Sequence, residues 1–136
     1  SEMCIRDRSK LMDVTPLVSK DRQLIESYGD GSFKISGVVY SSPVVVFPEL
    51  CIPLSNFDVA ESKICFFKAV FQTTYMPSIL LFGAGKNPYL LTEIERDFVR
   101  QQNCVLDVMN TGAACRTFNV LCAEDRRVAA ALIPVA

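Results

Sequence analysis

The sequence predicts a single α/β domain in which a mixed β-sheet is covered by helices. Two observations predict this fold. The first half of the chain contains short β-type segments separated by glycine turns, whereas strand-like and helix-like segments alternate from residue 78 onward. Half of the 136 residues are hydrophobic and 21% are charged, which is the composition of a globular chain. We therefore expect an antiparallel hairpin in the N-terminal half and right-handed βαβ crossovers in the C-terminal half.

The N-terminal half reads as a series of short strands. Strands are expected at residues 24–28, 33–35, 38–40 and 44–47. Residues 29–31 (Gly-Asp-Gly) favour a turn, because glycine adopts positive φ angles without steric cost. Residues 36–37 (Ser-Gly) suit a two-residue hairpin turn. Pro48 ends this β region, and a loop that contains Pro53 is expected up to Asn56.

The C-terminal half alternates helices with strands. Helices are predicted at residues 59–72, 93–102 and 112–124, capped by Asp58, Thr92 and Thr111, with Glu61 and Glu95 completing capping boxes in the first two. Strands are expected at residues 78–82, 104–109 and 128–135, and the first of these is apolar on both faces, as a central strand is. The buried helix faces are expected to contain Ile64, Cys65, Phe66, Phe67, Val70 and Phe71 in the first helix, Ile94, Phe98 and Val99 in the second, and Ala114, Phe118, Leu121 and Cys122 in the third.

The N-terminal end of the chain looks foreign to the rest of the sequence. Residues 1–9 have no helical or strand periodicity. We therefore expect a foreign or disordered segment at residues 1–14 and one domain at residues 15–136. The longest apolar run, residues 78–82, is far shorter than a membrane span, which needs about 20 residues. The net charge of −1 and the scattered lysines and arginines argue against a nucleic-acid partner.

Histidine is absent, which excludes several kinds of site. Ser-His-Asp triads, Cys-His dyads and histidine-containing metal sites are all ruled out. The six cysteines, at positions 4, 51, 65, 104, 115 and 122, include no pair separated by two residues, so they form no zinc-ribbon or thioredoxin-like motif. We interpret them as reduced, mostly buried thiols of a cytoplasmic protein, and we expect no metal and no cofactor.

One turn has the composition of an anion site. Residues 83–86 (Gly-Ala-Gly-Lys) follow a strand and precede a helix, and backbone amides at such a turn can bind an anion. The glycine spacing is not that of a phosphate-binding P-loop or of a dinucleotide site, and the alternative is simply a tight turn. If strands 78–82 and 104–109 are parallel neighbours, Asn110 and Thr111 lie at the same edge, where open α/β sheets bind ligands.

The start of the third helix offers a second kind of chemistry. Cys115 lies near the helix N-terminus and next to Arg116, and both features favour a thiolate. The alternative is a small residue packed under the sheet. Arg116, Arg126 and Arg127 suggest a basic spot near this helix, although residues 126–127 also suit a solvated entry to the last strand.

The C-terminal third carries a family resemblance. Residues 108–121 read Val-Met-Asn-Thr-Gly-Ala-Ala-Cys-Arg-Thr-Phe-Asn-Val-Leu, and residues 124–134 read Glu-Asp-Arg-Arg-Val-Ala-Ala-Ala-Leu-Ile-Pro. With the glycines of residues 31–37 and 83–85, this pattern resembles the Mth-nine-three-eight-like domains, a family that includes bacterial proteins of unknown function and the mitochondrial complex I assembly factor 3. The resemblance covers about residues 16–135. It implies a compact three-layer α/β fold without an established enzyme activity.

The chain departs from the family pattern at a few positions. The family usually has Asp at the position of Asn110, Gly at that of Asp125 and Thr at that of Ala84, and residues 53–54 (Pro-Leu) stand where a Trp is often expected. The changes at Asn110 and Asp125 weaken any transfer of a function that depends on charge. The fold assignment does not depend on them.

The residues and the resemblance lead to two main functional hypotheses. The first is a non-enzymatic interaction protein that assists the assembly or biogenesis of a membrane or respiratory complex, with respiratory-complex subunits or the membrane-insertion machinery as the partners that the resemblance implies. The second is a domain that binds a small anionic metabolite, or an enzyme of unknown reaction. Its site would be a crevice formed by Gly83, Gly85, Lys86, Asn110, Thr111, Cys115 and Arg116. A homodimer that buries an apolar patch is a third alternative.

Overall fold

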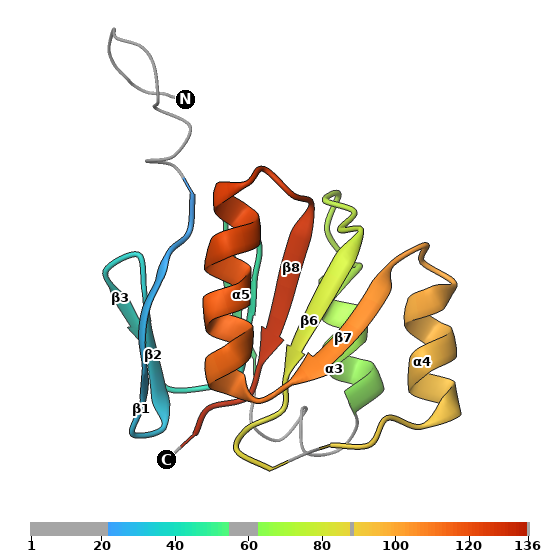
Figure 1. The fold of residues 1–136 in the computed structure, drawn as a ribbon, viewed down its shortest axis with the longest axis horizontal. Coiled ribbons are helices and arrows are strands. Elements are labelled where there is room, and N and C mark those ends of the chain that lie inside the picture. The colour runs from blue at the N-terminus through green and yellow to red at the C-terminus, as the bar shows by residue number, and fades with distance from the viewer. Residues whose placement is uncertain (1–21, 55–62, 88, 136) are drawn as a thin grey trace, which may run out of the picture.

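The structure is a computed structural model that describes residues 22–54, 63–87 and 89–135 (Figure 1). The strands are β1 (Ile25–Gly29), β2 (Ser32–Ile35), β3 (Val38–Tyr40), β4 (Val44–Val46), β5 (Cys51–Pro53), β6 (Ile79–Gly83), β7 (Val105–Met109) and β8 (Val128–Leu132). The helices are α3 (Lys63–Val70), α4 (Glu93–Arg100) and α5 (Thr111–Ala123). In these described ranges no helix is long and apolar enough to cross a membrane.

The strands form two sheets. β1, β2 and β3 make a small antiparallel sheet, and its β2–β3 turn places both Ser36 (φ 50°) and Gly37 (φ 84°) in the left-handed region, as a tight hairpin turn requires. The second sheet has the order β5-β4-β8-β6-β7. In it β6 runs parallel to β7 and β8, whereas β4 is antiparallel to β5 and β8. The predicted mixed sheet, N-terminal hairpin and C-terminal parallel crossovers are confirmed.

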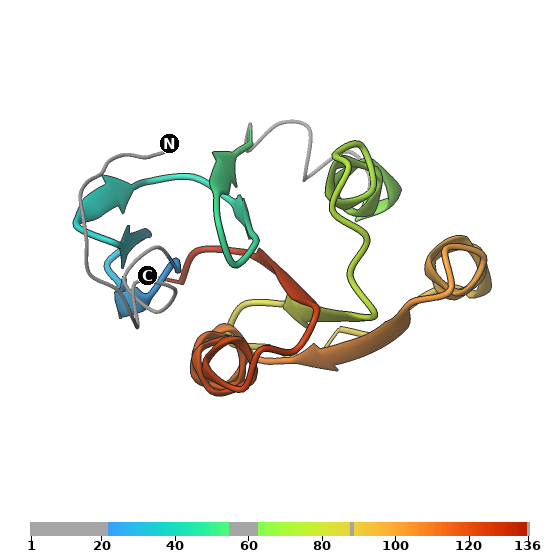
Figure 2. The same ribbon diagram turned by 90° about the horizontal axis from the view of Figure 1, so that it is seen from above.

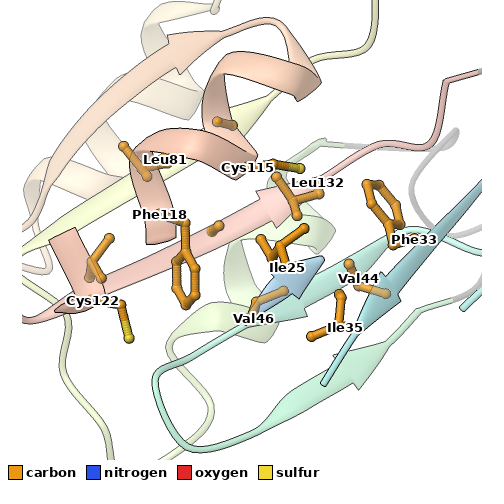
Figure 3. Packing of buried hydrophobic residues seen from close by; sticks show 13 residues of the cluster. Ile25, Phe33, Ile35, Val44, Val46, Leu81, Cys115, Phe118, Cys122 and Leu132 are labelled. Atoms are coloured by element: carbon orange, nitrogen blue, oxygen red, sulfur yellow. The ribbon is translucent and has the colours of Figure 1, made fainter. Parts of the chain in front are cut away.

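The layers lie on either side of the five-stranded sheet. Helices α3 and α4 cover one face, and α5 together with the small sheet covers the other (Figure 2). The chain therefore has the three-layer α/β architecture that the resemblance implies. Figure 3 shows the core on the α5 side of the sheet, which contains Phe118 and Cys115 of α5, Phe33 of β2 and Leu132 of β8.

Strand β8 is the centre of the sheet. All five of its residues are buried, and they alternate between the two cores: Val128, Ala130 and Leu132 face α5, whereas Ala129 and Ala131 face α3 and α4. A strand with helices on both faces is expected to be apolar throughout. The three alanines are small, which lets the layers on either side approach closely.

One predicted loop is a strand. Residues 51–53 form β5 at the edge of the large sheet, with Val44 opposite Pro53 and Val46 opposite Cys51. The prediction of a loop was wrong because proline argues against a central strand but is tolerated at an edge, where its missing N–H faces away from the ladder. The last strand ends at Leu132 instead of residue 135.

Two residues expected on buried helix faces are exposed. Ile94 is 74% exposed, and Cys65 is also exposed. In α4 the inward position belongs to Glu95, whose carboxylate accepts hydrogen bonds from the Tyr89 hydroxyl and from the backbone N–H of Thr92. The predicted capping box is present, and it turns Glu95 inward and Ile94 outward.

The cap of α5 also differs from the prediction. Asn110, and not Thr111, is the N-cap, because its Oδ1 accepts a hydrogen bond of 2.8 Å from the N–H of Ala113. The predicted cap Asp58, the residues around it in the first helix, and the N-terminal segment with the domain start near residue 15 lie outside the described residues.

Candidate functional site

A crevice lies at the carboxyl ends of β6 and β7. After β6 the chain continues to α4 on one face of the sheet, and after β7 it continues to α5 on the other face (Figures 1 and 2). Diverging connections of this kind leave the type of gap in which open α/β sheets bind ligands. A pocket of about 300 Å³ opens there, and it is lined by Ala84, Lys86, Asn87, Tyr89, Val108, Met109 and Asn110.

Thr111 fastens the backbone beneath this crevice. It is fully buried, and its hydroxyl accepts a hydrogen bond of 2.9 Å from the N–H of Gly85 while donating one of 2.7 Å to the carbonyl of Ile133. Its own N–H donates to the carbonyl of Gly85 at 3.0 Å. One side chain therefore joins the turn after β6, the start of α5 and the segment after β8.

The structure requires glycine at both glycine positions of the turn. A Cβ on Gly83 would lie 2.9 Å from the Leu132 side chain and 3.1 Å from the backbone of Thr111, which leaves no room for a side chain. Gly85 has a φ of +89°, a conformation that L-residues rarely adopt. Packing and backbone geometry thus account for the turn, in agreement with the alternative interpretation of the 83–86 sequence as a tight turn.

The polar groups of the crevice are suited to an anion. Lys86 is exposed, and within the described chain it forms no recorded ion pair. The N-terminus of α5 points its partial positive charge toward the same edge. Tyr89 donates to the Glu95 carboxylate, and burial raises the pKa of this tyrosine. Among the described residues, no three potential metal ligands come together.

Cys115 and Arg116 do not line this crevice. They line a groove of about 520 Å³ between β1 and α5, together with Tyr28 and Asn119. Burial raises the pKa of the Cys115 thiol to about 12, and Arg116 lowers it only in part. Burial therefore opposes the thiolate, and Cys115 packs in the core on this face of the sheet, as the alternative interpretation has it. Of the predicted crevice residues, Lys86 and Asn110 line the pocket, and Gly83 and Gly85 adjoin Thr111 at the same edge.

The three arginines of the predicted basic spot do not lie together. Arg116 lies in the N-terminal half of α5, whereas Arg126 and Arg127 follow its C-terminal end. The latter two line a different pocket, of about 380 Å³, together with Arg22. Sequence reasoning missed Arg22, because nothing in its local sequence indicates that it reaches the end of α5.

Sequence reasoning also missed Tyr89 and Asn87. Both belong to the connection between β6 and α4, and the only available signal was that they follow the glycine turn. Their contribution to the crevice depends on how that connection folds back beside β7. A turn motif indicates where an edge begins, but it does not show which later residues return to it.

Comparisons with known proteins agree with the fold. Residues 25–133 match the model of a family described as "Protein of unknown function (DUF498/DUF598)". An uncharacterized protein of Rhodobacter capsulatus is 30% identical over 111 residues, which is 82% of this chain and 84% of that protein. NADH dehydrogenase [ubiquinone] 1 alpha subcomplex assembly factor 3 of mouse is 31% identical over 113 residues, and the match spans 81% of this chain but only 60% of the mouse protein.

Solved structures show the same architecture. A solution structure from Bordetella pertussis, described as a Mth938-like domain, superposes with a TM-score of 0.67 at 23% identity, and covers 93% of this chain and 92% of that one. At this identity the likeness supports the fold alone. The fold is therefore that of a Mth938-like domain. The family match over most of the chain leads to one conclusion: the chain belongs to the DUF498/DUF598 family.

Proposed function

We propose that this domain is a non-enzymatic interaction module that assists the assembly of a membrane or respiratory complex. The observation that carries the proposal is the 31% identity with complex I assembly factor 3 of mouse over 81% of this chain. The chain corresponds to 60% of that protein's length, so the proposal concerns the shared domain.

The chemistry of the described residues supports a docking role. The buried thiols of Cys104 and Cys115 have raised pKa values, of about 11 and about 12, which keep them protonated and unreactive near neutral pH. Several large apolar side chains are instead exposed, among them Leu90 at 85% and Ile94 at 74%. Where such side chains form a contiguous patch, they suit a surface that binds other proteins.

A chimera tests the proposal. In the mouse assembly factor, the matching segment is replaced by residues 22–135 of this chain, and the chimera is expressed in mouse cells that lack the native factor. We expect mature complex I to return on native gels, together with its NADH:ubiquinone oxidoreductase activity, with the unmodified mouse protein as the positive control. A chimera that accumulates in mitochondria to the control level without restoring complex I would contradict the proposal.

A small anionic ligand in the crevice is the second candidate. The observation that favours it is the pocket of about 300 Å³ at the point where the connections after β6 and β7 diverge, with Lys86 at its rim. A rise in melting temperature with inorganic phosphate or a mononucleotide that disappears in Lys86→Ala, but not in Lys68→Ala of α3, would support it. Unchanged melting temperatures in all cases would exclude these ligands.

A further inference from the structure

The end of the molecule opposite the crevice carries the pocket that Arg126 and Arg127 line. The C-terminal end of α5, the turn into β8 and the segment before β6 come together there (Figure 1). We call this pocket of about 380 Å³ the arginine pocket, because Arg22, Arg126 and Arg127 line it together with Tyr75. Arg22 also lines a neighbouring pocket of about 310 Å³, so the two hollows adjoin along this end.

The three arginines are held differently. Arg22 is fixed, because it donates to the carbonyl of Cys122 at 2.7 Å and pairs with the carboxylate of Asp125. Arg127 donates to the carbonyl of Met76, and its guanidinium lies 5.2 Å from the centre of the Tyr75 ring. Arg126 is exposed, and no side-chain partner is recorded for it in the described part of the chain.

The charge balance of the arginine pocket favours an acidic occupant. Its lining carries three guanidinium groups against two carboxylates, those of Glu49 and Asp125. Asp125 is already paired with Arg22, and Arg127 is held by a carbonyl and a ring, neither of which cancels its charge. The lining therefore keeps one unbalanced positive charge, since Glu49 is the only remaining carboxylate of the described lining against Arg126 and Arg127.

The apolar surroundings favour a protein segment over a free ion. Leu24 lines one hollow and Leu50 the other, and they are 52% and 40% exposed. Met76, which follows Tyr75 in the chain, is 43% exposed. Tyr75 is rigid, since its ring packs edge-on against Phe47 at 5.6 Å and its hydroxyl donates to the carbonyl of Val128. Arginine, tyrosine and methionine are enriched in protein interfaces, and arginine and tyrosine dominate the residues that contribute most to binding.

We propose that the arginine pocket binds an acidic segment of a partner protein, whose carboxylates contact Arg126 and Arg127 and whose apolar side chains pack on Tyr75 and its leucine and methionine neighbours. This proposal rests on the proposed function, since it specifies the chemistry of the partner. Carboxylates bind guanidinium groups through charge-assisted hydrogen bonds, which supply orientation as well as affinity. The apolar rim adds the area that a free anion lacks.

Binding is measured directly on the full chain by ¹⁵N-HSQC titration. The probe is a blocked hexapeptide of sequence Glu-Asp-Phe-Glu-Asp-Leu, and the comparison peptide carries Gln and Asn in place of Glu and Asp. We expect saturable shifts at the amides of Thr73, Thr74, Arg126 and Arg127 with the acidic peptide. We expect Arg126→Glu to weaken this binding about tenfold or more, through loss of a charge-assisted contact and repulsion. The matched control Arg96→Glu, at an exposed arginine of α4, should leave it unchanged.

Three results would overturn the proposal. They are the absence of saturable shifts at the arginine pocket, equal binding of the neutral peptide, and equal weakening by Arg126→Glu and Arg96→Glu. Inorganic phosphate and acetate are titrated separately. If either one reproduces the shifts at the peptide's concentration, the pocket is a site for a small anion and not for a protein segment. Since the titration needs no respiratory complex, peptide binding with a failed chimera would remove the assembly role and leave the pocket assignment standing. A chimera that restores complex I, combined with no binding of the acidic peptide, would remove only the pocket assignment.

Discussion

Thr111→Val tests whether one hydroxyl group fastens the edge of the sheet. Valine has nearly the shape of threonine, so the substitution keeps the packing and removes the hydroxyl. The N–H of Gly85 and the carbonyl of Ile133 then lose the hydrogen bonds of 2.9 and 2.7 Å that Thr111 provides. Thr111 is fully buried, so water does not readily replace these bonds.

The expected cost follows from these two bonds. A buried polar group that loses its partner costs about 1–3 kcal/mol, so the two together are expected to lower the free energy of unfolding by about 3 kcal/mol. With a urea slope of about 1.5 kcal/mol per M, the unfolding midpoint falls by about 2 M. Thr111→Ser is the matched control, since it keeps the hydroxyl and loses one methyl group, which costs about 1 kcal/mol.

Urea unfolding followed by circular dichroism measures these differences. Hydrogen exchange at the amide of Gly85 adds a local readout, because this amide should lose protection in Thr111→Val and keep most of it in Thr111→Ser. A Thr111→Val protein within about 0.5 kcal/mol of the wild type, with the Gly85 amide still protected, would show that the hydroxyl does not hold this edge together.

Four further predictions concern other parts of the fold. Gly83→Ala should destabilise the protein by about 1–3 kcal/mol, because its Cβ meets the Leu132 side chain at 2.9 Å and the Thr111 backbone at 3.1 Å. Gly112→Ala should cost less, because the atoms nearest its Cβ are the hydroxyl and ring of Tyr28, an exposed side chain that can move aside. Thermal unfolding compares the two variants. Ellman's reagent should label exposed Cys65 at pH 8 long before Cys115. The pKa of Cys115 in the folded protein, about 12, exceeds the value of about 8.5 in the unfolded chain. The contribution of Cys115 to stability is therefore complete below about pH 8.5 and is lost as the pH rises toward 12. Urea unfolding midpoints at pH 7, 9 and 10 would detect this loss. Asp125 has a φ of 61° and pairs with Arg22 at the surface. Asp125→Gly should therefore stay within about 1 kcal/mol of the wild-type stability, because the relieved backbone strain offsets the lost ion pair, whereas Asp125→Ala should be less stable. The reverse order of the two variants in thermal unfolding would refute this account.

The elements with a strong hydrophobic pattern could be predicted from the sequence. β6 is an unbroken apolar run, which is typical of a strand buried on both faces of a sheet. Its parallel pairing with β7 follows from the helix between the two strands. The hairpin turn at residues 36–37 is equally local. In each of these cases a few neighbouring residues determine the structure.

The remaining features depend on contacts that the sequence does not display. Ile94 is exposed because the partners of Glu95 draw that carboxylate inward, and this outcome depends on where Tyr89 comes to lie. Cys115 stays a thiol because burial outweighs the effects of a helix N-terminus and a neighbouring arginine. Only part of the predicted site therefore assembles, since the residues on β6 and β7 share an edge while Cys115 and Arg116 face β1.

The position of β8 in the sheet has a consequence for biosynthesis. β8 is the last strand of the described chain, yet it lies between β4 and β6, and Val44 pairs with Leu132. While the ribosome is still translating, β4 and β6 have no strand between them, so the backbone edges that pair with β8 stay open and the two cores lack its apolar side chains. Such a nascent chain is exposed to aggregation and to chaperone binding until β8 emerges. A nascent chain whose β8 is still inside the ribosome should therefore be readily digested by proteases, and release of the chain, which lets β8 emerge, should make it resistant.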